Sequence, residues 1–95
     1  MATLHIEHPV REFDMWREAF DRFADVRRQA GVRDATVRRP IDDPAYVVVD
    51  LEFASTEQAT GFLEFLRSRV WSNPAASPAL IGVPRTMILD TAARE

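Results

Sequence analysis

Hydrophobic and polar positions change their period several times along this chain, and each change predicts a new element. Apolar residues alternate with polar ones over Ala2–Glu7, which predicts a half-buried strand. The same alternation predicts strands over Asp34–Arg39 and Arg85–Asp90. The β-branched run Ala45–Phe53 predicts a longer strand, apolar on both faces at its start and acidic on one face at its end.

A first helix is predicted from apolar residues spaced three and four apart. It begins within Arg11–Asp14 and ends before Gly31, a residue suited to a left-handed C-cap. Its apolar arc is wider than a surface helix needs. Within that arc Trp16, Phe20 and Phe23 form an aromatic stripe, which we interpret as core.

Two further helices are predicted in the second half of the chain. Ser55 and Gln58 have the spacing of a capping box and open a helix whose apolar stripe extends to Val70. Asn73 followed by proline predicts the N-cap of a short helix over Pro74–Leu80. Proline and aspartate between the second and third strands predict a hairpin turn there.

The resulting order is β-α-β-β-α-β in one domain, residues 1–95. Right-handed crossovers place both long helices on one face of an antiparallel sheet with strand order 4-1-3-2, which is a ferredoxin-like α+β sandwich. The side chains expected on the helix-covered face are Leu4, Ile6, Val37, Val49, Leu51, Phe53, Met87 and Leu89. Those expected on the open face are Thr3, His5, Glu7, Thr36, Arg38, Tyr46, Val48, Asp50, Glu52, Thr86, Ile88 and Asp90.

The doubly apolar start of the third strand and the wide apolar arc of the first helix together leave too much hydrophobic surface for a monomer, so a homodimer is predicted. A net charge of −3 gives no electrostatic reason to bind nucleic acid or an anionic membrane. The chain has no cysteine, which removes disulfides and zinc–cysteine sites from consideration. We expect no signal peptide, no membrane segment and a cytoplasmic location, because no apolar run has the required length or flanks.

The first candidate catalytic residue is His5, on the open face of the first strand. Asp50 or Glu52, on the neighbouring third strand, lies within reach of it, and a histidine held by a carboxylate can act as a general base. The alternative is a histidine hydrogen-bonded within a dimer interface. No metal site is predicted, since this oxygen-rich set is not distinctive and His8 faces the opposite side of the strand.

Three other residues are candidates for binding a ligand. Arg38 and Tyr46 on the open face suit an anionic or phenolic ligand, and the alternatives are a cross-strand ion pair and packing in the interface. Trp71 follows the second helix outside its main stripe. It is suited either to lining the mouth of a cavity or to packing under the short third helix.

The segment Phe13–Asp21, with the pattern FDxWRxxFD, resembles the start of the first helix in the dimeric α/β-barrel superfamily, close to the antibiotic-biosynthesis-monooxygenase-like proteins. The resemblance extends over the hairpin and over Ser55–Arg69. It implies two sheets packed open face to open face around a cavity. Members of the superfamily include cofactor-free oxygenases, haem-degrading enzymes and polyketide cyclases. No histidine occurs from Thr56 to Arg69, so neither a haem nor an organic cofactor is expected.

The resemblance and the residues together leave two functions open, and with them the question of whether this is an enzyme. One is a protein that binds or transforms a small aromatic or polyketide-like molecule in the barrel cavity, with monooxygenase-like or cyclase-like activity and no organic cofactor. The other is a non-catalytic dimeric module, structural or stress-responsive, whose interior is packed. A cavity large enough for an aromatic ring favours the first.

Overall fold

Four antiparallel strands form one sheet in the computed structural model, which describes residues 1–95. The strands are β1 (Ala2–Pro9), β2 (Asp34–Arg38), β3 (Tyr46–Phe53) and β4 (Arg85–Asp90). Their order across the sheet is β2-β3-β1-β4. Read from the other edge this is 4-1-3-2, so the predicted ferredoxin-like topology is confirmed.

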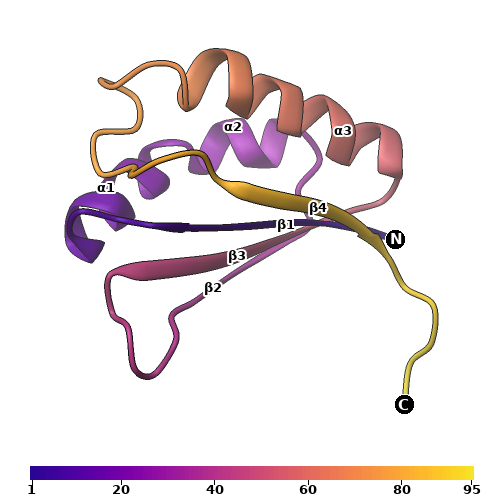
Figure 1. The fold of residues 1–95 in the computed structure, drawn as a ribbon. Coiled ribbons are helices and arrows are strands. Elements are labelled where there is room, and N and C mark those ends of the chain that lie inside the picture. Colours follow the sequence, from indigo (N-terminus) through magenta and orange to yellow (C-terminus); the bar gives the residue numbers. More distant parts are fainter.

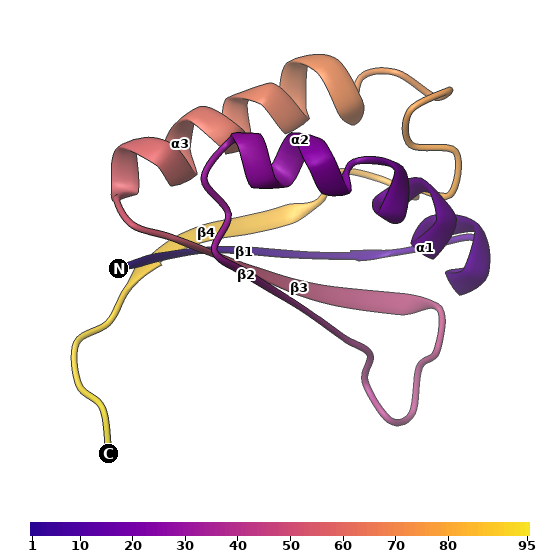
Figure 2. The same ribbon diagram turned by 180° about the vertical axis from the view of Figure 1, so that it is seen from behind.

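All helices lie on one face of this sheet, and the other face has no helical cover (Figure 1). The helices are α1 (Phe13–Arg22), α2 (Ala24–Gln29), α3 (Thr56–Phe65) and the π-helical turn η1 (Leu66–Val70). Figure 2 shows the same two layers from behind, with the C-terminal tail leaving the sheet on the uncovered side. None of these helices is long and apolar enough to cross a membrane.

The predicted capping residues of α3 and α2 occupy the expected places. Ser55 accepts a hydrogen bond from the backbone N–H of Gln58 at 3.2 Å, and the Gln58 side chain accepts one from the N–H of Ala54. Gly31, which follows α2, has φ +99°. Only glycine adopts such a backbone without strain, so this residue turns the chain from α2 toward β2.

Two predictions about helices were wrong. The first helix is not continuous: it breaks at Phe23, whose N–H bonds the carbonyl of Phe20 in a tighter turn. The segment 74–80 forms turns instead of a helix, because Asn73 closes a local turn and Leu80 pairs in an isolated bridge with Val10. That bridge ties the segment to the end of β1, and a helix there could not make it.

The assignment of the faces of β4 was also wrong. Leu4, on the helix side of β1, pairs with Ile88, while His5 on the open side pairs with Met87. Ile88 therefore packs against the core. Met87 and Leu89 lie on the open face, 47% and 41% exposed. Three consecutive apolar residues give β4 no clear alternation, so its register against β1 decides which face each side chain takes.

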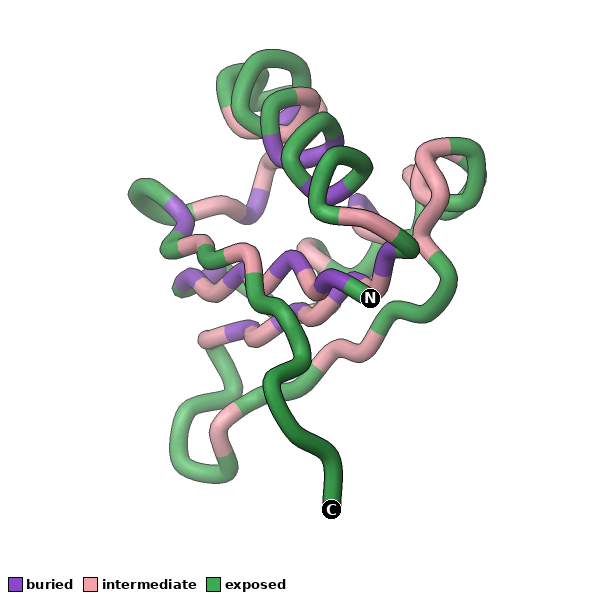
Figure 3. The backbone as a smooth tube through the Cα atoms, turned by 90° about the vertical axis from the view of Figure 1, so that its right-hand side faces the viewer, coloured by how far each residue is buried: buried purple, intermediate pink, exposed green.

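The hydrophobic core lies between the sheet and the helices, along the inward-facing positions of β1 and β3. Buried residues alternate along both strands, which Figure 3 shows as buried segments running through the centre of the sheet. The largest fully buried side chains are Phe53, Leu4, Leu51, Val10 and Val47. One face of the sheet is thus buried against the helices, and the other face carries polar and half-exposed residues.

Alanine at two glycines is expected to have opposite effects on stability. A Cβ at Gly31 would lie 2.8 Å from Nε2 of Gln58 and would need φ +99°, so Gly31→Ala should destabilise the fold by about 1–3 kcal/mol. Gly61 lies within α3 with no atom within 4 Å of its added Cβ, so Gly61→Ala should stabilise it by about 0.5–1 kcal/mol. Urea denaturation of both variants checks the pair. A stabilised Gly31→Ala would contradict the turn geometry.

Candidate functional site

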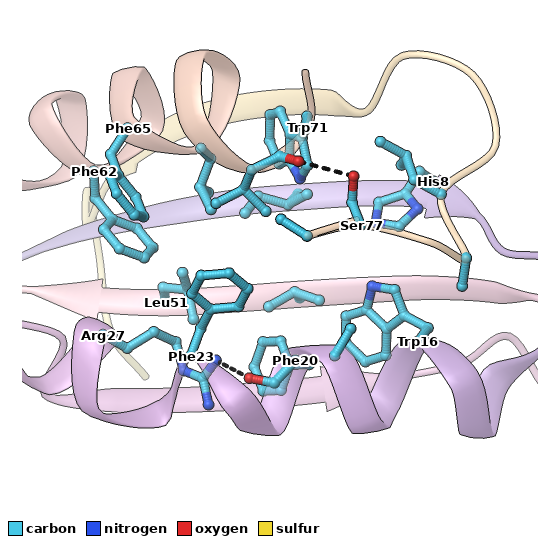
Figure 4. Close-up of a pocket in the computed structure, with 18 residues that line it drawn as sticks. His8, Trp16, Phe20, Phe23, Arg27, Leu51, Phe62, Phe65, Trp71 and Ser77 are labelled. Carbon is cyan, nitrogen blue, oxygen red and sulfur yellow. Dashed lines mark hydrogen bonds between the residues drawn. The ribbon is translucent and has the colours of Figure 1, made fainter. Parts of the chain in front are cut away.

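A pocket of about 80 Å³ lies between the sheet and the helices (Figure 4). Fifteen of its 18 lining residues are hydrophobic, and the lining comes from β1, β3, all the helices and the segment before β4. The pocket is therefore on the helix-covered face. It lies opposite the face on which the sequence placed most of its candidate residues.

The pocket exists because the two helical halves lie at different heights above the sheet. α3 packs directly on β1, β3 and β4, whereas α1 and α2 meet the sheet through long aromatic side chains. Trp16 and Phe20 stack with ring centroids 4.8 Å apart, and both pack against the core. The aromatic stripe predicted as core thus forms a wall of the pocket as well.

Trp71 enters the pocket because of the π-helical turn at the end of α3. The N–H of Trp71 bonds the carbonyl of Leu66 at 2.7 Å, the wider spacing that defines a π turn. The extra residue in this turn rotates the side chains that follow it, and the indole of Trp71 lines the pocket. Single π turns are frequent at functional sites, where they place a side chain that a regular helix would direct elsewhere.

Residues 72–80 close the end of the pocket. The hydroxyl of Ser77 hydrogen-bonds the carbonyl of Val70 at 2.8 Å, and the N–H of Arg11 bonds the carbonyl of Ala79 at 2.9 Å. Ala76, Ser77, Ala79 and Leu80 all line the pocket. The segment predicted to be a helix therefore serves as the end wall of the pocket.

His8 is the only ionisable group besides Arg27 in the lining, and it is 3% exposed. Its Nδ1 lies 2.9 Å from the carbonyl oxygen of Pro9, so this nitrogen donates and the ring is held in one neutral tautomer. Burial lowers the pKa of His8, which keeps the ring neutral. Its Nε2 is left with a free lone pair. Nε2 bonds no protein group and is not fully enclosed, and the His8 ring lines the pocket.

A second polar cluster, on the open face, contains His5 between two carboxylates. Nδ1 of His5 lies 2.7 Å from Asp50 and Nε2 lies 2.8 Å from Glu7. Arg38 donates to the other oxygen of Asp50 at 3.2 Å, and the hydroxyl of Tyr46 donates to the other oxygen of Glu7 at 2.8 Å. These five residues form one continuous hydrogen-bond network across β1, β2 and β3.

Each ring nitrogen of His5 lies within hydrogen-bond distance of a carboxylate, an arrangement that favours the protonated ring. The hydrogen bond to Glu7, followed by that to Asp50, raises the pKa of His5, while the hydrogen bond from His5 lowers the pKa of Glu7. With both nitrogens donating, the ring has no lone pair with which to accept a proton. The geometry therefore favours a hydrogen-bonded histidine on a packing face over a general base at this position.

The remaining sequence candidates divide between the two faces. Glu52 is bonded to Thr3 at 2.7 Å and takes no part in the His5 network. Trp71 lines the pocket on the opposite side of the sheet. No group of three or more histidine or acidic side chains has an arrangement suited to a metal ion. The structure thus joins His5, Asp50, Arg38 and Tyr46, and separates Glu52 and Trp71 from them.

His8 is the residue that the sequence analysis passed over. The signal was present, because a strand alternates and His8 lies three residues from His5, on the covered face. What the sequence could not show is that the covered face contains a pocket at this point. That depends on the height of α1 above the sheet and on the turn at residues 72–80.

Stability should depend on pH through both histidines, with opposite signs. Because the pKa of His5 is raised in the folded protein, this residue adds to the free energy of unfolding. The added stability is complete below pH 6.5, the ordinary pKa of histidine, and is lost as the pH rises through the pKa of His5 in the folded protein. The pKa of His8 is lowered in the folded protein, so the stability that its neutral ring provides is complete above pH 6.5. That stability is lost as the pH falls toward the pKa of His8 in the folded protein. Denaturation at several pH values should show His5→Gln flattening the alkaline side and His8→Gln the acid side. The reverse pattern would contradict the two charge assignments.

Comparison with known proteins places the fold among solved structures. No family model matches the sequence, and no curated protein matches it. A protein of unknown function from Nitrosomonas europaea has a TM-score of 0.73 at 13% identity, covering 99% of this chain and 91% of that chain. An antibiotic biosynthesis monooxygenase has a TM-score of 0.68 at 10% identity, covering 98% and 100%.

A putative antibiotic biosynthesis monooxygenase from Nitrosomonas europaea has a TM-score of 0.66 at 14% identity. The match covers 96% of this chain and 90% of that one. At these identities the likeness is one of fold. It extends over nearly the whole chain, and the resemblance predicted from the sequence is confirmed at that level. This chain therefore has the ferredoxin-like fold of the antibiotic-biosynthesis-monooxygenase-like proteins.

Proposed function

We propose that this protein is a homodimer that binds a compact hydroxylated aromatic molecule in the pocket between its sheet and its helices, with no organic cofactor. The observation that carries this proposal is the neutral His8, whose ring lines an almost entirely apolar pocket and whose Nε2 bonds no protein group. A single polar acceptor in an apolar pocket orients a ligand by one hydrogen bond.

The volume of the pocket limits the ligand to about one ring. An engineered apolar cavity of about 150 Å³ takes up benzene; the pocket here is smaller, about 80 Å³, but it opens to solvent, so a single ring would extend into the opening. A flavin or a haem would not fit beside a substrate in this space. The pocket lies on the helix-covered face of the sheet, so the alternative of a non-catalytic module with a packed barrel interior concerns a different space, between two open faces.

The end of the pocket at His8 suits a hydroxyl group. The rings of His8 and Trp16 meet edge to face with centroids 6.3 Å apart, and neither Nε2 of His8 nor the indole N–H of Trp16 bonds another protein group. Figure 4 shows both side chains at the same end. A hydroxyl donates to the histidine and accepts from the indole, which a purely accepting or purely donating group cannot do.

This arrangement also suits a reaction in which negative charge develops on the ligand's oxygen. Nε2 of His8 accepts the hydrogen bond of the hydroxyl, and the N–H of Trp16 donates to its oxygen and stabilises the charge that develops there. Two structurally similar proteins are named antibiotic biosynthesis monooxygenase, one of them as putative, and a phenolate is an electron-rich partner for dioxygen. We therefore propose, as the first reaction to test by oxygen uptake, oxidation of such a ring to a quinone: one atom of dioxygen enters the ring, and two electrons and two protons from the ligand itself reduce the other atom to water.

The open face supports the proposed dimer. Val48, Met87 and Leu89 are exposed or half-exposed there beside the His5 network. The network has two positive side chains, His5 and Arg38, and two negative ones, Asp50 and Glu7. Because these charges pair with one another, a second subunit can cover the network without burying an unpaired charge.

Ligand binding can be followed by tryptophan fluorescence, because both tryptophans of the chain line the pocket. Phenol is expected to quench this fluorescence saturably and to bind at least tenfold more tightly than toluene, which lacks the hydroxyl. In His8→Leu the preference for phenol should disappear while toluene still binds. Equal binding of phenol and toluene to the unmodified protein would contradict the proposal.

Filling the pocket is expected to abolish binding of both probes. Ala79 is 1% exposed and lines the end wall, so Ala79→Leu places a larger side chain in the ligand's volume. The matched control is Ala75→Leu, an exposed position in the same segment that does not line the pocket. The same titration checks both variants. Unchanged phenol binding by a folded Ala79→Leu protein would place the ligand elsewhere.

A further inference from the structure

Arg27 differs from the other arginines of α1 and α2 in having no acidic partner. Each of the others is paired with a carboxylate on the same two helices: Arg17 with Asp21, Arg22 with Glu18, and Arg28 with Asp25. These paired arginines are solvent-exposed. Arg27 is half-buried and lines the pocket. An unpaired charge costs more free energy the more it is buried. Arg27 is the most buried of these four arginines, and it is the one without a counter-ion.

The guanidinium of Arg27 is held in a fixed place beside the pocket. It lies over the ring of Phe20, 3.6 Å from the centroid, and its Nη1 donates to the carbonyl of Phe20 at 2.6 Å. Its remaining N–H groups bond no protein acceptor, and none of these nitrogens is fully enclosed. A guanidinium with free N–H groups in a fork is suited to bind a carboxylate through two parallel hydrogen bonds.

Figure 4 places Arg27 with Phe23 at one end of the pocket and His8 with Trp16 at the other. The apolar side chain of Phe20 lies between these ends, and Leu51 lies beside Phe23. A molecule that met both polar groups would have a hydroxyl at one end, an aromatic ring in the middle and an anion at the other end. Phe20 would meet the ring of the ligand through its edge, because one of its faces stacks with Trp16 and the other with the guanidinium.

We infer that the ligand of this pocket is an aromatic hydroxy acid, with its carboxylate bound by Arg27. This inference rests on the proposed function, because it assigns the second end of a ligand whose hydroxyl end is bound by His8. It also accounts for the burial of an arginine without a protein counter-ion. A neutral phenol leaves that charge unpaired.

A structural role for Arg27 is the competing explanation, since its bond to the carbonyl of Phe20 closes the end of α1. The two explanations differ in what the charge of the ligand does. A structural arginine affects stability and leaves the choice between charged and neutral ligands unchanged. An arginine that binds a carboxylate determines that choice.

The test compares 4-hydroxybenzoate with 4-hydroxybenzamide, a neutral molecule of nearly the same shape, by tryptophan quenching. The unmodified protein is expected to bind the acid at least tenfold more tightly than the amide. Arg27→Gln should remove that preference, Arg27→Lys should keep part of it, and Arg28→Gln should leave it intact as the matched control. Equal binding of acid and amide by the unmodified protein overturns the inference without any variant.

Two further results separate the inference from the proposed function. If phenol and the amide bind and the acid is not preferred, the inference fails and the proposed function stands. If phenol, the amide and the acid all fail to quench, the proposed function fails. Loss of the preference in both Arg27→Gln and Arg28→Gln would show a general effect of charge and would also overturn the inference.

Discussion

A chain that ends at Gly82 is expected to show no cooperative unfolding transition. β4 pairs with β1 along its whole length, and its removal would leave β1 as an unprotected edge. Ile88 packs against the core and Pro84 is buried, so the loss also exposes apolar surface. A buried side chain of this size contributes about 1.5–3 kcal/mol, against a total of about 5–15 kcal/mol for a small domain. Circular dichroism during heating measures the result.

The control for this truncation removes only residues 92–95. These lie beyond β4, are exposed, and extend away from the sheet (Figure 1). The shortened protein should melt within the error of the full chain. A cooperative melt from the chain ending at Gly82 would show that β4 is dispensable and would contradict the core as described.

Aspartate at Val48 and at Val49 should have very different effects, although these residues are adjacent. Val49 is 2% exposed between the sheet and the helices, so Val49→Asp buries an unpaired charge and should unfold the domain. Val48 is half-buried on the open face and pairs with Glu7 across the strands. Val48→Asp should leave a folded subunit that no longer dimerises.

Light scattering and circular dichroism separate these outcomes. The unmodified protein is expected to have twice the 10.8 kDa mass of one chain, and Val48→Asp the mass of one chain with an unchanged spectrum. An unmodified protein at 10.8 kDa would exclude the dimer. A Val48→Asp protein that remains dimeric would place the contact between subunits on another surface.

The fold could be predicted from the sequence because its strands carry strong local signals. The alternation in β1 and the β-branched run of β3 fix their faces, and the handedness of the crossovers then gives the sheet order. β4 was the exception. Its apolar residues are consecutive, so only the pairing of Leu4 with Ile88 in three dimensions decides its orientation.

Only those parts of the candidate site whose positions follow from the order of the strands in the sheet could be predicted from the sequence. The approach of Asp50 to His5 follows from the strand order and was foreseen, whereas the position of His5 between two carboxylates was not. The pocket depends on features with weak local signals. These are the break at Phe23, the π turn before Trp71 and the bridge between Val10 and Leu80. Each results from packing between segments far apart in the chain.

The most direct test of the proposed binding site is the ¹⁵N NMR spectrum of the two histidine side chains, recorded with and without phenol. Without ligand, His8 should show one protonated and one unprotonated nitrogen, and His5 should show two protonated nitrogens. Phenol is expected to shift the unprotonated Nε2 of His8 and to leave both nitrogens of His5 unchanged. Shifts confined to His5 would place the ligand on the open face and would contradict the site proposed between the sheet and the helices.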